Sequence, residues 1–286
     1  MLIRLGYDIE LQLFTPTTVI AVLNVHPSRI TDLREPDVIE ISPDVVQDKY
    51  LDSFGNICTR IAAPAGPLRL YNSTLIEDSG EPDAVDWDAP ALPAEKLPAD
   101  TVQFLLASRY CEVDRLSELA WGLFGNIPAG WARAQAVCDW VHDYVTFGYE
   151  FARPTKTALD VYDERRGVCR DFQHLAISLC RALHMPTRYV TGYLGDIGVP
   201  PAGPMDFSAW YEVWLGDRWW SFDARNHQPR IGRVPIAMGR DAADVAITTS
   251  FGATALNRFT VVTEEVRELP IAAELTYLDA ELTALR

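Results

Sequence analysis

The sequence predicts an α+β fold, in which a β-sandwich-like N-terminal domain precedes a domain whose helices pack on an antiparallel sheet. Apolar and polar residues alternate within the first 80 positions, and residues 81–100 are then rich in acidic residues, alanine and proline. After residue 100 the apolar period becomes helical before strands return, an order typical of α+β domains. We therefore expect a β-rich domain at 1–80, a proline-rich linker at 81–100 and a second domain at 101–286.

The N-terminal strands follow from alternation and from turn residues. Residues 3–13 place an apolar side chain at every second position, and Pro16 ends this strand. Ser53-Phe54-Gly55-Asn56 is a turn signal between two short strands. The strands expected in this domain are 3–13, 18–25, 48–52, 57–62 and 68–76.

The second domain is expected to begin with helices. Asp100 and Gln103 resemble a capping pair that opens a short helix, residues 114–124 form a helix that ends at Gly125, and an apolar stripe continues over 131–145. A further helix begins near Cys169. The strands expected after it are 188–194, 206–215, 218–224 and 259–266, with Gly216-Asp217 as a two-residue hairpin loop.

A last apolar stripe predicts a helix at the end of the chain. Its members are Ile271, Leu275, Leu278, Leu282 and Leu285. Such a helix either docks on its own domain or joins two copies of the chain in a homo-oligomer.

Charge and hydropathy exclude two classes of partner. The formal net charge of -15, without a local run of Lys or Arg, repels phosphate backbones, so we expect no nucleic acid partner. No apolar run is long enough for a signal peptide or a membrane span, so we expect no membrane partner and a cytoplasmic protein.

The five cysteines lack the spacing of a zinc site, and their odd number and scatter favour free thiols in a reducing compartment. We expect no metal and no cofactor. Four of them are interpreted as small buried apolar residues; they are Cys58, Cys111, Cys138 and Cys180.

Cys169 has a distinct position, because it stands where a helix begins after Gly167. Peptide dipoles and free amide groups at a helix N-terminus favour a thiolate and lower the thiol pKa. The same amides can stabilise the oxyanion that forms when a thiolate attacks an amide or acyl carbonyl. Cys169 is thus a candidate nucleophile, with a buried structural cysteine as the alternative.

Three motifs around this helix resemble the bacterial transglutaminase-like superfamily, which has a papain-like cysteine fold. They are Gly-Val-Cys-Arg-Asp-Phe at 167–172, Asp-Phe-Ser-Ala-Trp-Tyr-Glu-Val-Trp-Leu at 206–215 and Trp-Trp-Ser-Phe-Asp-Ala-Arg at 219–225. The resemblance implies Cys169 as nucleophile and Asp223 as the group that orients a histidine base. Ser208 occupies the position of that histidine, and a hydroxyl cannot accept the thiol proton at neutral pH.

The hairpin can be examined by its register alone. With Gly216-Asp217 as the loop, positions that sum to 433 face each other, so Trp210 opposes Asp223 and Ser208 opposes Arg225. The polar and aromatic face of the hairpin is then a candidate cleft wall, or else a solvated, salt-bridged surface. Its candidate binding residues are Trp210, Glu212 and Arg225.

His227 is a candidate replacement for the missing base. If the second hairpin strand continued to His227, the ring would lie diagonal to Ser208. Asn226 and Pro229 instead favour an end of the ladder and a surface histidine. His174 lies five residues after Cys169, about 140° around the helix, which is a poor position for a base.

Two functions remain open at this point. The first is a thiol-dependent amide or acyl hydrolase or transferase, in which His227 or another group replaces the histidine base. The second is a catalytically inactive relative that binds a peptide, an amine or a cell-wall fragment in the retained cleft. The missing histidine favours the second, whereas Cys169 and Asp223 favour the first.

Overall fold

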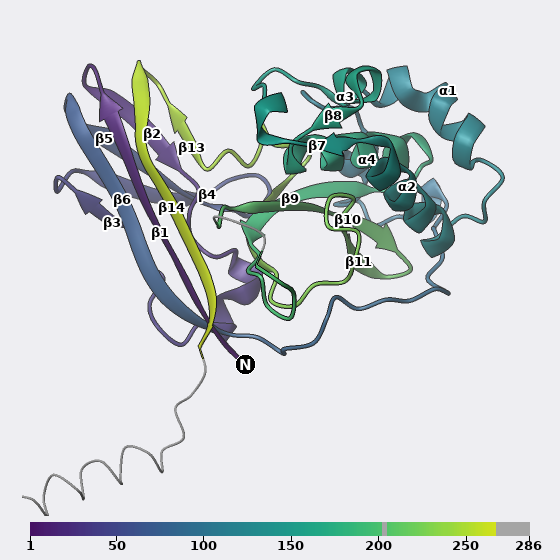
Figure 1. Cartoon of the computed structure of the whole chain (residues 1–286), viewed down its shortest axis with the longest axis horizontal. Coiled ribbons are helices and arrows are strands. Elements are labelled where there is room, and N and C mark those ends of the chain that lie inside the picture. Colours follow the sequence, from purple (N-terminus) through teal and green to yellow (C-terminus); the bar gives the residue numbers. More distant parts are fainter. Residues whose placement is uncertain (202–204, 267–286) are drawn as a thin grey trace, which may run out of the picture.

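The computed structural model describes residues 1–201 and 205–266 and has an α+β fold, as predicted. A β sandwich occupies one side of the molecule, and helices packed on a second antiparallel sheet occupy the other (Figure 1). The predicted C-terminal helix of residues 271–285 falls outside the described residues. Within the described ranges, no helix is long and apolar enough to cross a membrane.

Two four-stranded sheets form the sandwich. The alternation at 3–13 is confirmed, because the apolar members of this strand are all at most 5% exposed. One sheet has the order β14-β1-β6-β3, and its strands are Thr254–Val266, Leu2–Leu13, Gly66–Glu77 and Glu40–Ser42. The other has the order β13-β2-β5-β4, and its strands are Thr248–Ser250, Thr17–Ala21, Ile57–Ala63 and Gln47–Leu51.

The end of the described chain returns to the sandwich. β14 pairs with β1 from Leu2 opposite Val266 to Leu13 opposite Thr254, and β13 pairs with β2. Without β14, the long strand β1 would leave a row of backbone groups unpaired at the sheet edge. The assignment of 101–286 to one domain is therefore corrected for 248–266, which complete the N-terminal sheets.

The proline-rich segment 81–100 connects the two parts along the surface of the second one. Single bridges join Pro82 to Ile231 and Pro90 to Gly130, and the segment's one helix is the short 3-10 helix η2 at Ala94–Lys96. The other short 3-10 helices are η1 at Pro27–Asp32, η3 at Val102–Leu105 and η4 at Tyr149–Phe151.

In the second part, helices cover one face of the sheet β11-β10-β9-β12 (Figure 1). The strands are β11 at Arg218–Phe222, β10 at Ser208–Leu215, β9 at Thr187–Tyr193 and β12 at Val234–Gly239. The helices are α1 at Val113–Phe124, α2 at Trp131–Tyr144, α3 at Ala158–Glu164 and α4 at Cys169–Ala182, and the short strands β7 and β8 at Thr146–Phe147 and Arg166–Gly167 pair in parallel.

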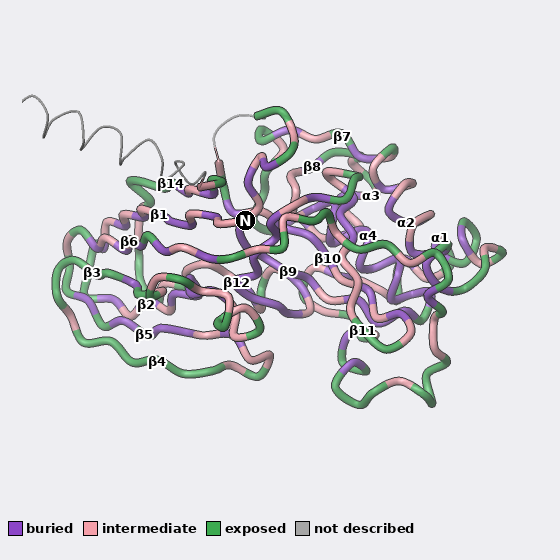
Figure 2. Tube along the Cα trace, turned by 90° about the horizontal axis from the view of Figure 1, so that it is seen from below, coloured by how far each residue is buried: buried purple, intermediate pink, exposed green. Residues whose placement is uncertain are grey.

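Helix α4 is the centre of this part. Nearly all of its residues are buried, and it packs against α1, α2, α3 and the sheet (Figure 2). The predicted hairpin register is confirmed, since Tyr211 faces Phe222 and Leu215 faces Arg218. β11 ends at Phe222, however, so the pairs that would include Asp223 and Arg225 do not form.

Candidate functional site around Cys169

Cys169 opens helix α4 as predicted. The carboxylate of Asp171 accepts a hydrogen bond from the Val168 N–H at 3.0 Å and so caps the helix. Gly167 allows this capping, because a Cβ atom there would lie 2.6 Å from the Asp171 side chain. Asp171 is itself ion-paired to Arg170. This local structure holds the sulfur at the first position of a rigid helix.

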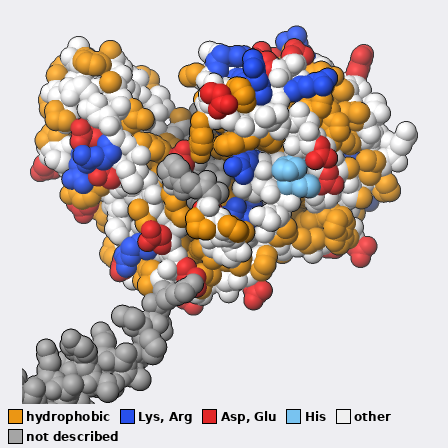
Figure 3. Space-filling view, viewed as in Figure 1, with side chains coloured by type: hydrophobic (Ala, Val, Ile, Leu, Met, Phe, Trp, Pro, Cys, Tyr) orange, Lys and Arg blue, Asp and Glu red, His pale blue; other side chains and the backbone are white. Residues whose placement is uncertain are grey.

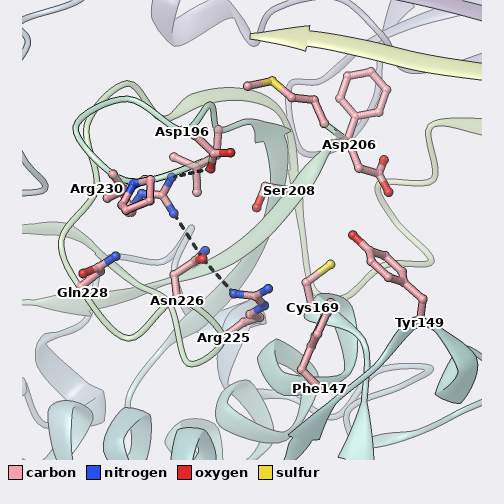
Figure 4. Close-up of a pocket in the computed structure, with 15 residues that line it drawn as sticks. Phe147, Tyr149, Cys169, Asp196, Asp206, Ser208, Arg225, Asn226, Gln228 and Arg230 are labelled. Carbon is pink, nitrogen blue, oxygen red and sulfur yellow. Dashed lines mark hydrogen bonds and ion pairs between the residues drawn. The ribbon is translucent and has the colours of Figure 1, made fainter. Parts of the chain in front are cut away.

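A pocket of about 280 Å³ lies in front of the sulfur (Figure 4). Cys169 and Ser208 both line it, together with Tyr149, Asp206 and Arg225. In the space-filling view a notch separates the upper ends of the sandwich and the α+β part (Figure 3), whereas the residues that line the pocket all belong to the α+β part. The sequence motifs thus bring Cys169 and Ser208 to one cavity.

The electrostatic surroundings do not activate the thiol. Burial and the negative charge of Asp206 raise the pKa of Cys169 to about 11, although the Arg170 amide opposes the shift. The expected lowering by the helix N-terminus is therefore outweighed, and the thiol is protonated at neutral pH.

Asp223 is buried, and its bonds are made within the fold. Oδ1 accepts hydrogen bonds from Gln173 Nε2 at 3.1 Å and from the backbone amides of Arg225 and Asn226, each at 3.0 Å. Oδ2 accepts from Asn226 Nδ2 at 2.8 Å and from Arg233 Nη1 at 3.1 Å. These five donors already match or exceed the approximately four lone-pair positions of a carboxylate, and none of them is a histidine.

The position of Asp223 explains its ionisation. Burial alone would raise its pKa, but the charge of Arg233 and the bonds from Asn226 hold the pKa below its ordinary value. Arg233 is shared with Asp83 of the segment 81–100, at 2.8 Å. Asp223 borders a separate cavity of about 70 Å³ and does not line the pocket of Cys169.

The interpretation of His227 as a relocated base is contradicted by the structure. The amides of Arg225 and Asn226 bond to Asp223, so the chain turns after β11, and His227 has a left-handed φ of 56°. Its Nε2 lies 2.8 Å from Asp139 Oδ1, and its ring stacks on His142 with the centroids 4.3 Å apart. It borders the cavity of Asp223 instead.

The other histidines are also elsewhere. His174 is fully buried and stacked on Tyr110, and burial lowers its pKa well below 6.5. The five histidines of the chain are all among the described residues, and none lines the pocket of Cys169; they are His26, His142, His174, His184 and His227.

Of the three predicted binding residues, only Arg225 borders the pocket. Trp210 is 1% exposed and packs with Val190 and Met238, so the prediction that it forms a cleft wall is wrong. Glu212 pairs with Arg188 at 2.6 Å, which agrees with the alternative of a salt-bridged surface.

Several pocket residues were missed at the sequence level. Asp206 lies two positions before Ser208 in the same motif, and this closeness in the sequence could have pointed to it as a pocket residue. Tyr149, Asn226 and Arg230 carry no local pattern that points to a site. Within the described ranges, no group of three His, Cys, Asp or Glu side chains is arranged to hold a metal ion.

Comparison with known proteins agrees with this architecture. The family model of the transglutaminase-like superfamily matches residues 118–224. A crystal structure from Cytophaga hutchinsonii, of a protein named as a putative cysteine protease, is 30% identical, with a TM-score of 0.81 over 94% of this chain and 93% of that one.

Two curated relatives are uncharacterised proteins. The first, from Mycobacterium leprae, is 27% identical over 246 residues, which cover 77% of this chain and 82% of the relative. The second, from Mycobacterium tuberculosis strain H37Rv, is 27% identical over 216 residues, which cover 68% of each chain.

Proposed function

Since this chain belongs to the transglutaminase-like superfamily, we propose that it retains the cleft beside Cys169 to bind a peptide or amine ligand and does not carry out acyl transfer. One observation carries this proposal: Asp223, which matches the family's orienting aspartate, is bound on both oxygens by other residues and paired with Arg233. The carboxylate that would orient a histidine base is therefore occupied by structural hydrogen bonds and an ion pair.

The thiol supports the same proposal. Acyl transfer needs a group that removes the proton of Cys169 and returns it to the leaving group. With a pKa of about 11, roughly one thiol in ten thousand is ionised at pH 7. Ser208 is the nearest counterpart of the family base, and its hydroxyl does not titrate in this range.

The cleft itself supports binding. It has a volume of about 280 Å³ and is lined by charged, amide and aromatic side chains as well as by Cys169. Concave sites with a few converging polar groups are typical of ligand binding.

A second candidate function is thiol-dependent hydrolysis or transfer at an amide, with Asp206 as the base. The observation that favours it is the proximity of Asp206, the strongest charged influence on the Cys169 thiol. Partial desolvation at the pocket also raises the pKa of Asp206, although part of the residue is exposed, and this brings the carboxylate closer to a proton acceptor of useful strength. Asp206 would take the thiol proton as sulfur attacks the carbonyl, and would return it to the departing amine.

The two functions differ in a direct assay. Ammonia release from a glutaminyl peptide, with and without an added primary amine, is measured for the wild type, Cys169→Ala and Asp206→Asn. Our proposal predicts equal, background rates for all three. Release by the wild type that Cys169→Ala abolishes would overturn it, and a loss in Asp206→Asn as well would identify the second function.

We also propose that the protein works in a reducing compartment such as the cytoplasm. All five cysteines are free thiols, and four of them are buried. Quantifying free thiols in protein purified without reductant tests this, and five free thiols are expected.

A further inference from the structure

Opposite charges lie on two sides of the Cys169 pocket. In the view of Figure 4, Arg225, Asn226 and Arg230 lie on one side of Cys169 and Ser208, together with Asp196, which is ion-paired to Arg230; Tyr149 and Asp206 lie on the other. A ligand that crosses the sulfur would therefore meet a basic side and an acidic side.

Arg225 is the cation available to a ligand. Its guanidinium lies 4.2 Å from the ring centre of Phe147, and its Nη1 donates to Asn226 Oδ1 at 3.3 Å. Among the ion pairs of residues 1–201 and 205–266, none involves Arg225. A guanidinium has five N–H donors, so most of them remain for a carboxylate in the pocket.

The neighbouring arginines are already engaged. Arg230 is only 6% exposed and binds the Gly195 carbonyl at 2.8 Å, Asn226 Oδ1 at 3.2 Å and Asp196 at 3.5 Å. Arg233 is held between two carboxylates. The charge of Arg230 is offset by Asp196, which lines the same side of the pocket, so Arg225 supplies the net positive charge there and is positioned to make the contact.

Asp206 is the matching anion. Its residue is exposed, it borders the pocket next to Tyr149 and Cys169, and no Lys or Arg of the described chain forms an ion pair with it. An ammonium group at this carboxylate would gain a charge-assisted hydrogen bond in partly desolvated surroundings.

Building on the proposed binding function, we propose that the pocket selects short zwitterionic peptides, with the ligand's carboxylate at Arg225 and its ammonium at Asp206. The peptide backbone then crosses Cys169 and Ser208. Two charges fixed on opposite sides favour a ligand with both charges over one that has either alone.

The test is calorimetric titration with glycine peptides of two to four residues, each also as its N-acetyl and its C-terminal amide form. At the best length, the free peptide is expected to bind the wild type at least about tenfold more tightly than either capped form. Arg225→Gln should remove the difference between free peptide and amide, and Asp206→Asn the difference between free and acetylated peptide.

Matched controls come from the hairpin loop. Arg218→Gln and Asp217→Asn change the same charges at exposed positions that do not line the pocket, and both are expected to bind like the wild type. Thermal unfolding of each variant checks that it is folded.

Two results would overturn the inference: equal binding of free and capped peptides, or no binding of any glycine peptide by the folded wild type. Neither bears on catalysis. The proposal of a non-catalytic cleft fails instead if ammonia release depends on Cys169, and the charge preference would then be measured from KM.

Discussion

Arg233 Nη1 lies 3.1 Å from Asp223 Oδ2, and both side chains are almost fully buried. Arg233 also contacts Asp83, so one guanidinium links the connecting segment, the turn after β11 and the start of β12. The residue that matches the family's orienting aspartate therefore has a structural partner in this chain.

Arg233→Met is expected to destabilise the fold strongly. It would leave Asp223 and Asp83 without their cation, and breaking a buried ion pair by removing one partner costs about 3–5 kcal/mol. The free energy of unfolding in urea measures this. Arg258→Gln, which removes two exposed ion pairs, to Asp8 and Glu10, is the control and should cost less than about 1 kcal/mol. Equal, small losses in both variants would contradict a stabilising role of Arg233.

The low pKa of Asp223 predicts a pH dependence of stability. Because the folded pKa lies below the ordinary 3.8, Asp223 stabilises the fold above that value, and this contribution is lost as the pH falls toward the folded pKa. Unfolding free energies between pH 5 and pH 2 should therefore fall less steeply for Asp223→Asn than for the wild type. Parallel curves would show that Asp223 does not titrate with folding.

The hairpin illustrates what the sequence predicts and what it does not. Gly216-Asp217 determines the register, which is a local property, and the pairing of Tyr211 with Phe222 follows from it. Whether the strand continues past Phe222 depends on the Asp223 side chain, which takes the amides of the next residues and turns the chain. His227 is displaced by that turn.

Other differences arise from pairing between distant segments. Asp83 and Arg233 are 150 positions apart in the sequence, and no periodic pattern of nearby residues predicts an ion pair between them. β12 is a fully buried strand in which Pro235 interrupts the usual strand pattern, and the ladder shifts register between Pro235 and Ala237. Cys169 and Ser208, in contrast, line one pocket, as the resemblance of their motifs to the transglutaminase-like superfamily implies.

His227→Asn tests the conclusion that His227 does not act as a base for Cys169. Asparagine tolerates the left-handed backbone at this position, so the turn should persist. We expect the rate of Cys169 alkylation by iodoacetamide at pH 7 to stay within about twofold of the wild type, because His227 borders another cavity. A tenfold lower alkylation rate would indicate that His227 does lie near the Cys169 thiol.

Ser208→His should supply the imidazole base that the pocket lacks. An imidazole at this position shares the pocket with Cys169 and can form a thiolate–imidazolium pair, so alkylation at pH 7 should rise by tenfold or more. Ser208→Asn, similar in size and without a titrating group, is the control and should not change the rate.

Ammonia release by Ser208→His should still stay low. Asp223 is committed to Arg233 and Asn226, and loss of an orienting carboxylate costs about 10⁴ in a triad enzyme. Turnover at the level of an ordinary enzyme would show that Asp223 is free to reorient.

The most direct measurement is the pH dependence of Cys169 alkylation in the wild type, followed on the Cys169 peptide by mass spectrometry; the other four cysteines are buried. The rate is expected to rise continuously with pH toward the thiol pKa of about 11, without a plateau near neutrality. A plateau reached by about pH 7 would reveal an activated thiolate and contradict the account of a binding cleft.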